Sequence, residues 1–166
     1  DDIQTRQYRS PEAIICFPYG PEADIWSLAC IVFELATGDL LFKPKNGAHH
    51  GKSDDHLALI LELLGRKSFP KRMQLAKHYK DFFNSKGELR KIKNLKYWLL
   101  KDILMDKYKF TEQDATELDA FLKPMLQLDP GTRCTATEAL AHEWLEGVDT
   151  YLPIPLDSPP VSDDER

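Results

Sequence analysis

The sequence has little of what membrane-bound or secreted proteins usually carry. No apolar run approaches the roughly 18–20 residues that a membrane-spanning helix needs. No basic segment followed by an apolar one opens the chain, so we expect neither a membrane anchor nor a signal peptide. The first residue is Asp1 rather than methionine, and we therefore expect the chain to be part of a longer protein.

Cysteine is also scarce. Cys16, Cys30 and Cys134 form no short-spaced pair, and each lies in an apolar, helix-like context. This pattern predicts buried, reduced thiols in a cytosolic or nuclear protein. The histidines lack zinc-ligand spacing with the cysteines. We therefore predict no metal site and a cytoplasmic and nuclear location.

Charge is unevenly distributed along the 166 residues, whose net charge is −5. Residues 65–109 hold 14 basic and 4 acidic residues, whereas the rest of the chain has a net charge of −15. The basic block could face a polyanion or could be ordinary solvated surface. No aromatic residues interleave with it to stack bases, so we expect no direct nucleic-acid binding. The acidic remainder instead favours a cationic ligand.

Apolar residues recur at helical spacing in most of the chain. The expected helices cover residues 10–16, 21–37, 54–64, 98–107, 112–126 and 135–144, with a short helical stretch after Pro70. The helix that ends before Gly38 is apolar nearly all round, which predicts a central, buried position. Residues 84–96 look irregular, and residues 147–166 form a proline-rich acidic tail that we expect to be disordered. No series of strands is present, so the predicted fold class is mainly α. We expect residues 1–146 to form one helical bundle.

Four short motifs, in this order, resemble the lower half of a protein-kinase C-lobe. Residues 5–12 (Thr-Arg-Gln-Tyr-Arg-Ser-Pro-Glu) resemble the end of an activation segment, and residues 24–30 (Asp-Ile-Trp-Ser-Leu-Ala-Cys) resemble the start of the F helix. Residues 129–133 (Asp-Pro-Gly-Thr-Arg) and 142–145 (His-Glu-Trp-Leu) are similar to motifs at the end of the lobe. The resemblance covers residues 1–146, and the tail is not matched.

Longer stretches resemble the SR-protein kinases, which phosphorylate serines in Arg-Ser-rich splicing factors. They are residues 1–10, 34–42 and 54–65, together with an insert-like segment over residues 82–98. The resemblance implies a part of an ATP-dependent serine/threonine kinase that acts as a monomer on basic, Arg-Ser-rich proteins. A different kinase of the cyclin-dependent or mitogen-activated branch is also compatible with the motifs.

The resemblance also implies roles for single residues. Asp24 would accept backbone N–H bonds from the catalytic loop, although its place in a first helical turn explains an acid there equally well. Glu12 and Arg133 would form a buried ion pair at the base of the lobe. Thr5 would bridge catalytic groups, and the remaining residues of the loop would lie near the substrate: Arg6, Gln7, Tyr8 and Arg9.

Three acids form the sharpest hypothesis. Asp55 and Glu62 are seven residues apart, so both project from one face of a helix. Asp39 follows the preceding helix and can approach that face. By residue type alone, these could be a turn residue, a helix-dipole partner and a solvated acid. The SR-protein kinase resemblance implies instead a docking groove for an arginine-rich segment, with Lys107 as a fourth member.

The sequence lacks the motifs that perform phosphoryl transfer in kinases. It contains no Gly-x-Gly-x-x-Gly, no His-Arg-Asp and no Asp-Phe-Gly. ATP and magnesium would belong to the full-length kinase, and we expect this chain alone to bind neither and to be inactive. A second hypothesis of another class is a non-catalytic docking module, or pseudokinase remnant, that binds Arg-rich peptides.

Overall fold

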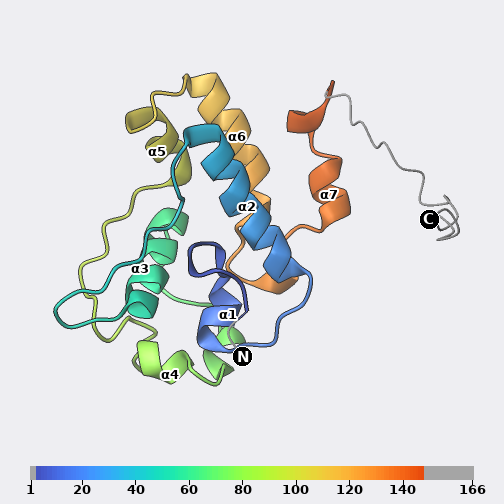
Figure 1. The fold of residues 1–166 in the computed structure, drawn as a ribbon. Helices are drawn as coiled ribbons and strands as arrows, with labels where there is room; N and C mark the ends of the chain where they lie inside the picture. The colour runs from blue at the N-terminus through green and yellow to red at the C-terminus, as the bar shows by residue number, and fades with distance from the viewer. Residues whose placement is uncertain (1–2, 148–166) are drawn as a thin grey trace, which may run out of the picture.

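The computed structural model describes residues 3–147 (Figure 1). The tail expected over residues 147–166 therefore lies, apart from Gly147, outside the described residues, as do Asp1 and Asp2. The helices are α1 (Pro11–Ile15), α2 (Glu22–Thr37), α3 (Lys52–Leu64), α4 (Tyr79–Phe82), α5 (Leu100–Asp106), α6 (Glu112–Met125) and α7 (Ala136–Leu140). Short 3-10 turns are η1 (Arg6–Tyr8), η2 (Met73–Leu75), η3 (Pro130–Thr132) and η4 (Glu143–Leu145).

The predicted mainly α class is confirmed. Residues 3–147 contain no β-strand, and their one isolated bridge joins Phe83, just before the segment predicted to be irregular, to Leu89 within it. Among these residues, no helix has both the length and the apolar character needed to cross a bilayer.

Helix ends follow the capping signals in the sequence. Thr111 accepts a hydrogen bond from the Asp114 N–H at 3.1 Å before α6, and Thr135 and Glu138 form the reciprocal capping box of α7. α2 is followed by Gly38, whose φ of 73° is rarely adopted by residues that carry a Cβ. Local capping therefore sets several helix boundaries without help from tertiary contacts.

The last helix is shorter than the predicted 135–144. α7 ends at Leu140, and the backbone of His142 is extended. The side-chain Nδ1 of His142 accepts a hydrogen bond from the Trp144 N–H at 3.2 Å. A side chain that bonds the backbone two residues ahead competes with helix continuation. The new direction lets Trp144 stack on Phe121 of α6, with ring centroids 4.7 Å apart.

The core forms around one stripe of α2, which runs through the middle of the molecule with α6 beside it (Figure 1). Trp26 and Phe33 of this stripe are buried, and Trp26 stacks on Phe42 at a centroid distance of 5.9 Å. Phe33 meets Tyr108, from the segment after α5, edge-on at 5.6 Å. Aromatic contacts of this kind contribute beyond the area they bury, so they fix the residues after α2 and α5 against it.

The prediction that α2 is buried nearly all round is wrong for one face. Leu28, Ile31 and Leu35 are exposed, Leu35 to 81%. Within residues 3–147, the core packs along the stripe of Trp26 and Phe33, and η1 contacts α2 at Ser27 and Glu34, so neither covers this face. An apolar helix pattern does not reveal how many neighbours are available to cover it.

The cysteines differ from one another. Cys30 lies buried in α2, where burial raises the pKa of its thiol. Cys134 is partly buried. The prediction of burial is wrong for Cys16, which is exposed because it follows the end of α1 in a left-handed conformation with a φ of 53°.

A buried ion pair joins segments that are far apart in the sequence. Arg133 donates from Nη1 to Glu12 Oε1 at 2.7 Å and from Nη2 to Glu12 Oε2 at 2.9 Å. The same guanidinium donates to the backbone carbonyls of Glu22 and Gln127 and lies over the Trp26 ring. Neither side chain of the pair has exposed surface. The pair therefore holds α1, the start of α2 and the segment after α6 together.

We predict that Glu12→Gln lowers the free energy of unfolding by about 3–5 kcal/mol, because it leaves the buried Arg133 guanidinium without a counter-charge. Urea denaturation followed by circular dichroism measures this loss. Arg72→Ala is the control, because Arg72 also pairs with a carboxylate, that of Asp129, but is 51% exposed. Its loss should be about 1 kcal/mol or less, and equal losses for the two variants would contradict the prediction.

A second buried titratable group is His56 of α3. It is fully buried, and its ring lies 5.3 Å from the ring of Phe42. Burial lowers the pKa of His56 to about 3, and the positive charges of Arg6 and Arg9 act in the same direction. His56 is therefore neutral in the folded protein at neutral pH.

This burial makes stability depend on pH. Because the pKa of His56 is lower in the folded state, the unfolded chain takes up a proton first as the pH falls below about 6.5. Stability should be level above that pH and should then fall by up to about 1.4 kcal/mol per pH unit toward pH 3. Urea titrations between pH 7.5 and 5 of the native chain, of His56→Leu and of the exposed control His49→Gln measure this slope. A slope that persists in His56→Leu would show that another group causes it.

Candidate functional site

A groove lies between α3 and the extended segment before α5. The segment is attached to α3 by two hydrogen bonds, from the Lys96 N–H to Glu62 Oε1 at 2.7 Å and from the Trp98 N–H to the Glu62 carbonyl at 3.4 Å. The resulting pocket has a volume of about 240 Å³. Its lining, which we call the α3 groove, consists of Leu41, Phe42, Leu59, Glu62, Leu63, Lys96, Trp98 and Ile103.

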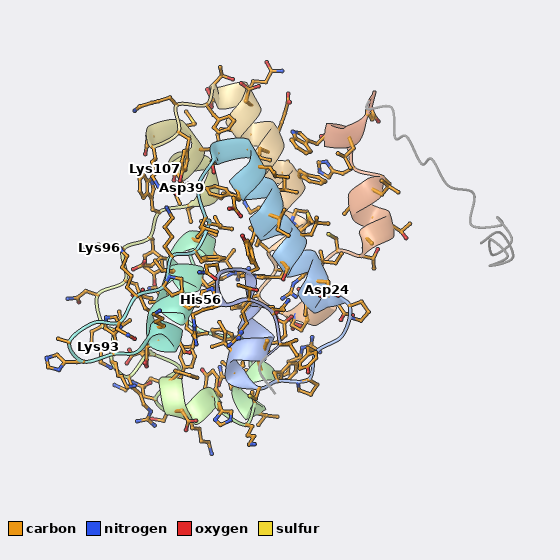
Figure 2. The ribbon with its side chains drawn as sticks, in the orientation of Figure 1. Asp24, Asp39, His56, Lys93, Lys96 and Lys107 are labelled. Carbon is orange, nitrogen blue, oxygen red and sulfur yellow. The ribbon has the colours of Figure 1, made fainter. Side chains whose placement is uncertain are left out.

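Asp39 lies at one end of this region, where α2 and α5 finish. Gly38 turns the chain out of α2, and Asp39 follows it directly. Asp39 Oδ2 accepts hydrogen bonds from Lys107 Nζ and from the Tyr108 hydroxyl, both at 2.9 Å, and its Oδ1 pairs with Lys43 Nζ. Figure 2 shows Asp39 and Lys107 side by side. Lys43, followed by Lys107 and Tyr108, holds the pKa of Asp39 well below its usual range.

The other two acids both lie on α3, two turns apart, as their spacing predicts. Asp55 is in the first turn, and its Oδ2 accepts the Lys45 N–H at 2.8 Å. Glu62 is near the end of the helix, and its Oε1 accepts the Lys96 N–H. Within the described residues, the second carboxylate oxygen of each makes no hydrogen bond. Both acids are therefore oriented by the backbone and keep an acceptor for an external donor.

The three acids border one continuous surface. Residues 39–45 begin at Asp39, line the α3 groove opposite Glu62 through Leu41 and Phe42, and end with the Lys45 N–H on Asp55. A cationic chain laid along this surface would meet carboxylates at both ends and beside the pocket. Such an arrangement can bind guanidinium groups by charge-assisted hydrogen bonds.

The loop of residues 5–9 lies along α2, from Ser27 to Glu34, and against the N-terminal turn of α3. Arg6 Nη1 donates to Ser53 Oγ at 3.1 Å, and the Tyr8 hydroxyl donates to Glu34 Oε2 at 2.7 Å. The latter bond raises the pKa of Tyr8. Arg9 Nη2 donates to the Gln4 carbonyl at 3.0 Å. These three side chains thus help to fix the shape of the loop.

Thr5 and Gln7 have a different setting in the same loop. Thr5 is exposed and precedes η1, whereas Gln7 is partly buried within it. Neither side chain has a hydrogen-bond partner among the described residues, so the structure leaves both available to groups outside residues 3–147.

Asp24 does not join the acidic surface. It is exposed in the first turn of α2, at the opposite end of that helix from Asp39 (Figure 2). Its carboxylate accepts no hydrogen bond from the described residues, so nothing in them tests the proposed support of a catalytic loop.

Sequence reasoning missed several residues that shape the site. Lys43 and Tyr108 hold Asp39, and Trp98 lines the α3 groove. Gln4 fastens the loop to α2, because its side-chain amide donates to the Ala23 carbonyl at 2.7 Å and to Ser27 Oγ at 2.8 Å.

The basic block of residues 65–109 is partly neutralised by acids outside it. Lys91 pairs with Asp54 at 3.1 Å, and Lys107 with Asp39 at 2.9 Å. Over residues 3–147, no group of three or more His, Cys, Asp or Glu side chains is arranged to hold a metal ion.

This chain is similar to known proteins over most of its length. The protein kinase domain family matches residues 1–145. The chain is 51% identical over 149 residues to protein kinase dsk1 of Schizosaccharomyces pombe, covering 89% of this chain and 27% of that protein. It is 50% identical over 146 residues to human SRSF protein kinase 3, and the match covers 87% of this chain and 25% of that protein. It is also 50% identical over 155 residues to the serine/threonine-protein kinase SRPK of Physarum polycephalum, and the match covers 92% of this chain and 36% of that protein.

The chain thus spans about a quarter to a third of the length of these three relatives. The aligned part covers 87–92% of this chain. This chain belongs to the protein kinase domain family, as a helical part of such a domain that is similar to the SR-protein kinases.

Proposed function

We propose that this chain is the substrate-facing part of a serine/threonine protein kinase that phosphorylates Arg-Ser-rich proteins. The observation that carries the proposal is the pair Asp55 and Glu62, each held by a backbone N–H and each with a second oxygen open to a donor. The names of the relatives support the kinase activity and, for SRSF protein kinase 3, an SR-type substrate. We further propose that the full-length protein acts as a monomer in the cytoplasm and nucleus.

Arginine is the ligand that suits the surface best. A guanidinium offers several N–H donors in a rigid fork, whereas an ammonium is a compact point charge. The α3 groove adds apolar walls, including Trp98, along which the aliphatic part of an arginine side chain can pack. A run of arginines would also be attracted from a distance by the summed charge of the acids.

The remaining predicted residues would act on the substrate or support the catalytic part. We propose that Thr5, Arg6, Gln7, Tyr8 and Arg9 form the substrate-proximal loop and that Asp24 holds the catalytic loop. The residues present do not fit an ATP and magnesium site, because the motifs that hold both are missing from the sequence. We propose residues 1–146 as the kinase part and residues 147–166 as a separate tail.

We predict that Asp55→Ala/Glu62→Ala weakens binding of an Arg-Ser repeat peptide about tenfold, because it removes two oriented carboxylates. Fluorescence anisotropy with a labelled (Arg-Ser)4 peptide measures the affinity. The control is Glu117→Ala/Glu143→Ala, which changes the net charge equally at two exposed acids outside the groove. Equal weakening in both double variants would show that only the overall charge matters and would contradict a docking site.

We predict that a protein joining this chain to the missing catalytic motifs transfers phosphate from ATP to serine in an Arg-Ser peptide, whereas the chain alone transfers none. A radiolabelled-phosphate assay measures the transfer. The variant Asp55→Ala/Glu62→Ala should raise KM for a long Arg-Ser substrate more than it lowers kcat, because docking lies away from the chemistry. Peptide binding without any transfer by the longer protein would establish a docking module instead of an enzyme.

A further inference from the structure

The three acids of the docking surface are not equally available. Asp55 and Glu62 each keep one carboxylate oxygen without a partner among residues 3–147, whereas both oxygens of Asp39 are occupied by side chains of the protein itself. An arginine can bind Asp39 well only if one of these internal partners leaves.

The two lysines that pair with Asp39 are held very differently. Lys107 Nζ also donates to the Tyr108 hydroxyl at 2.7 Å and lies 4.6 Å from the centre of the Tyr108 ring, so three interactions fix it. Tyr108 is itself packed against Phe33 of the core. Lys107 therefore belongs to the rigid wall of the site.

Among the described residues, Asp39 is the one group with which the Lys43 ammonium pairs. Its ammonium makes no other hydrogen bond or ion pair with the described residues, its side chain is 50% exposed, and it lies in the non-helical segment after α2. A lysine on a flexible four-carbon stem that is attached through one exposed pair is easily displaced, because such pairs contribute little.

We propose that Lys43 is an internal competitor for the cationic side chains of the substrate. It pairs with Asp39 while the surface is empty and swings into solvent when a substrate arginine takes its place. The inference rests on the proposed docking function, and it assigns Lys43 as a residue that sets affinity and specificity. An arginine competes better than an external lysine, because its guanidinium is more weakly hydrated and offers several N–H donors, one of which can replace Lys43 at Asp39 Oδ1.

The exchange has a cost that depends on the ligand. A ligand with a single charge gains one pair at Asp39 and loses the pair with Lys43, so its net gain is small. A ligand that also reaches Asp55 and Glu62 binds open acceptors there and is less affected. Lys43 therefore makes the surface favour long, multiply charged arginine segments over isolated basic residues.

The test is the affinity of the full chain carrying Lys43→Ala for the (Arg-Ser)4 peptide, measured by fluorescence anisotropy at low salt. The affinity should tighten about two- to fivefold, the range expected for loss of one exposed competing pair. The gain should shrink at high salt, because exposed pairs are screened. Lys45→Ala is the matched control: Lys45 is exposed on the same segment and contacts Asp55 only through its backbone N–H. Its affinity should stay unchanged.

A measurement without peptide tests the pairing itself. In Lys43→Ala, the carboxyl 13C resonance of Asp39 should titrate with a pKa closer to its ordinary value, and in Lys45→Ala it should titrate as in the native chain. An Asp39 pKa that does not move, or a peptide affinity that is unchanged or weaker in Lys43→Ala, overturns the assignment of Lys43. Equal tightening in Lys45→Ala also overturns it, because the effect would then be one of overall charge.

These outcomes separate the inference from the function on which it rests. If Asp55→Ala/Glu62→Ala weakens peptide binding while Lys43→Ala has no effect, docking stands and the competitor role of Lys43 fails. The Asp39 pKa could instead respond to Lys43→Ala while neither the native chain nor Lys43→Ala binds the peptide. In that case the ion pair exists, but the proposed docking function fails and the competitor role fails with it.

Discussion

The arrangement of this molecule depends on one buried carboxylate–guanidinium pair, Glu12 with Arg133. Burying either charge alone would be costly, so the two must meet, and they are 121 residues apart in the chain. The remaining guanidinium donors go to backbone carbonyls at the start of α2 and after α6. Backbone acceptors leave little freedom of position, and the pair therefore aligns α2 with the rest of the helices.

The position of α2 in turn decides where the acidic surface forms. The helix has 16 residues, and Gly38, which follows it, turns the chain so that Asp39 lies beside the end of α5. There Lys107 and Tyr108 hold it, while α3 presents Asp55 and Glu62 on one face and backbone N–H groups orient them. The surface combines carboxylates that are open with one that is covered by lysines of the same chain, so its affinity for cations is a balance of attraction and internal competition.

Much of this could be predicted from sequence where the cause is local. The caps at Thr111 and Thr135 and the glycine after α2 act over four or five residues, and the helix ends they define lie within one residue of the predicted positions. The two-turn spacing of Asp55 and Glu62 follows from helix geometry alone. Two predictions failed: α7 stops early because His142 bonds the backbone two residues ahead and Trp144 packs on Phe121 of α6, and one face of α2 remains exposed because no other element covers it among residues 3–147.

By itself, the sequence determined the helices, their caps and the order of charged residues along the chain, because hydrophobic period and capping are short-range properties. The pair of Glu12 and Arg133 was implied by the resemblance and not by any spacing along the chain. Tertiary structure alone decided that Gln4 fastens the loop to α2 and that Asp39 is covered by Lys43, Lys107 and Tyr108. The physical reason is that an electrostatic contact depends on distance in space and on burial, and neither is encoded by spacing along the chain once the residues lie in different elements.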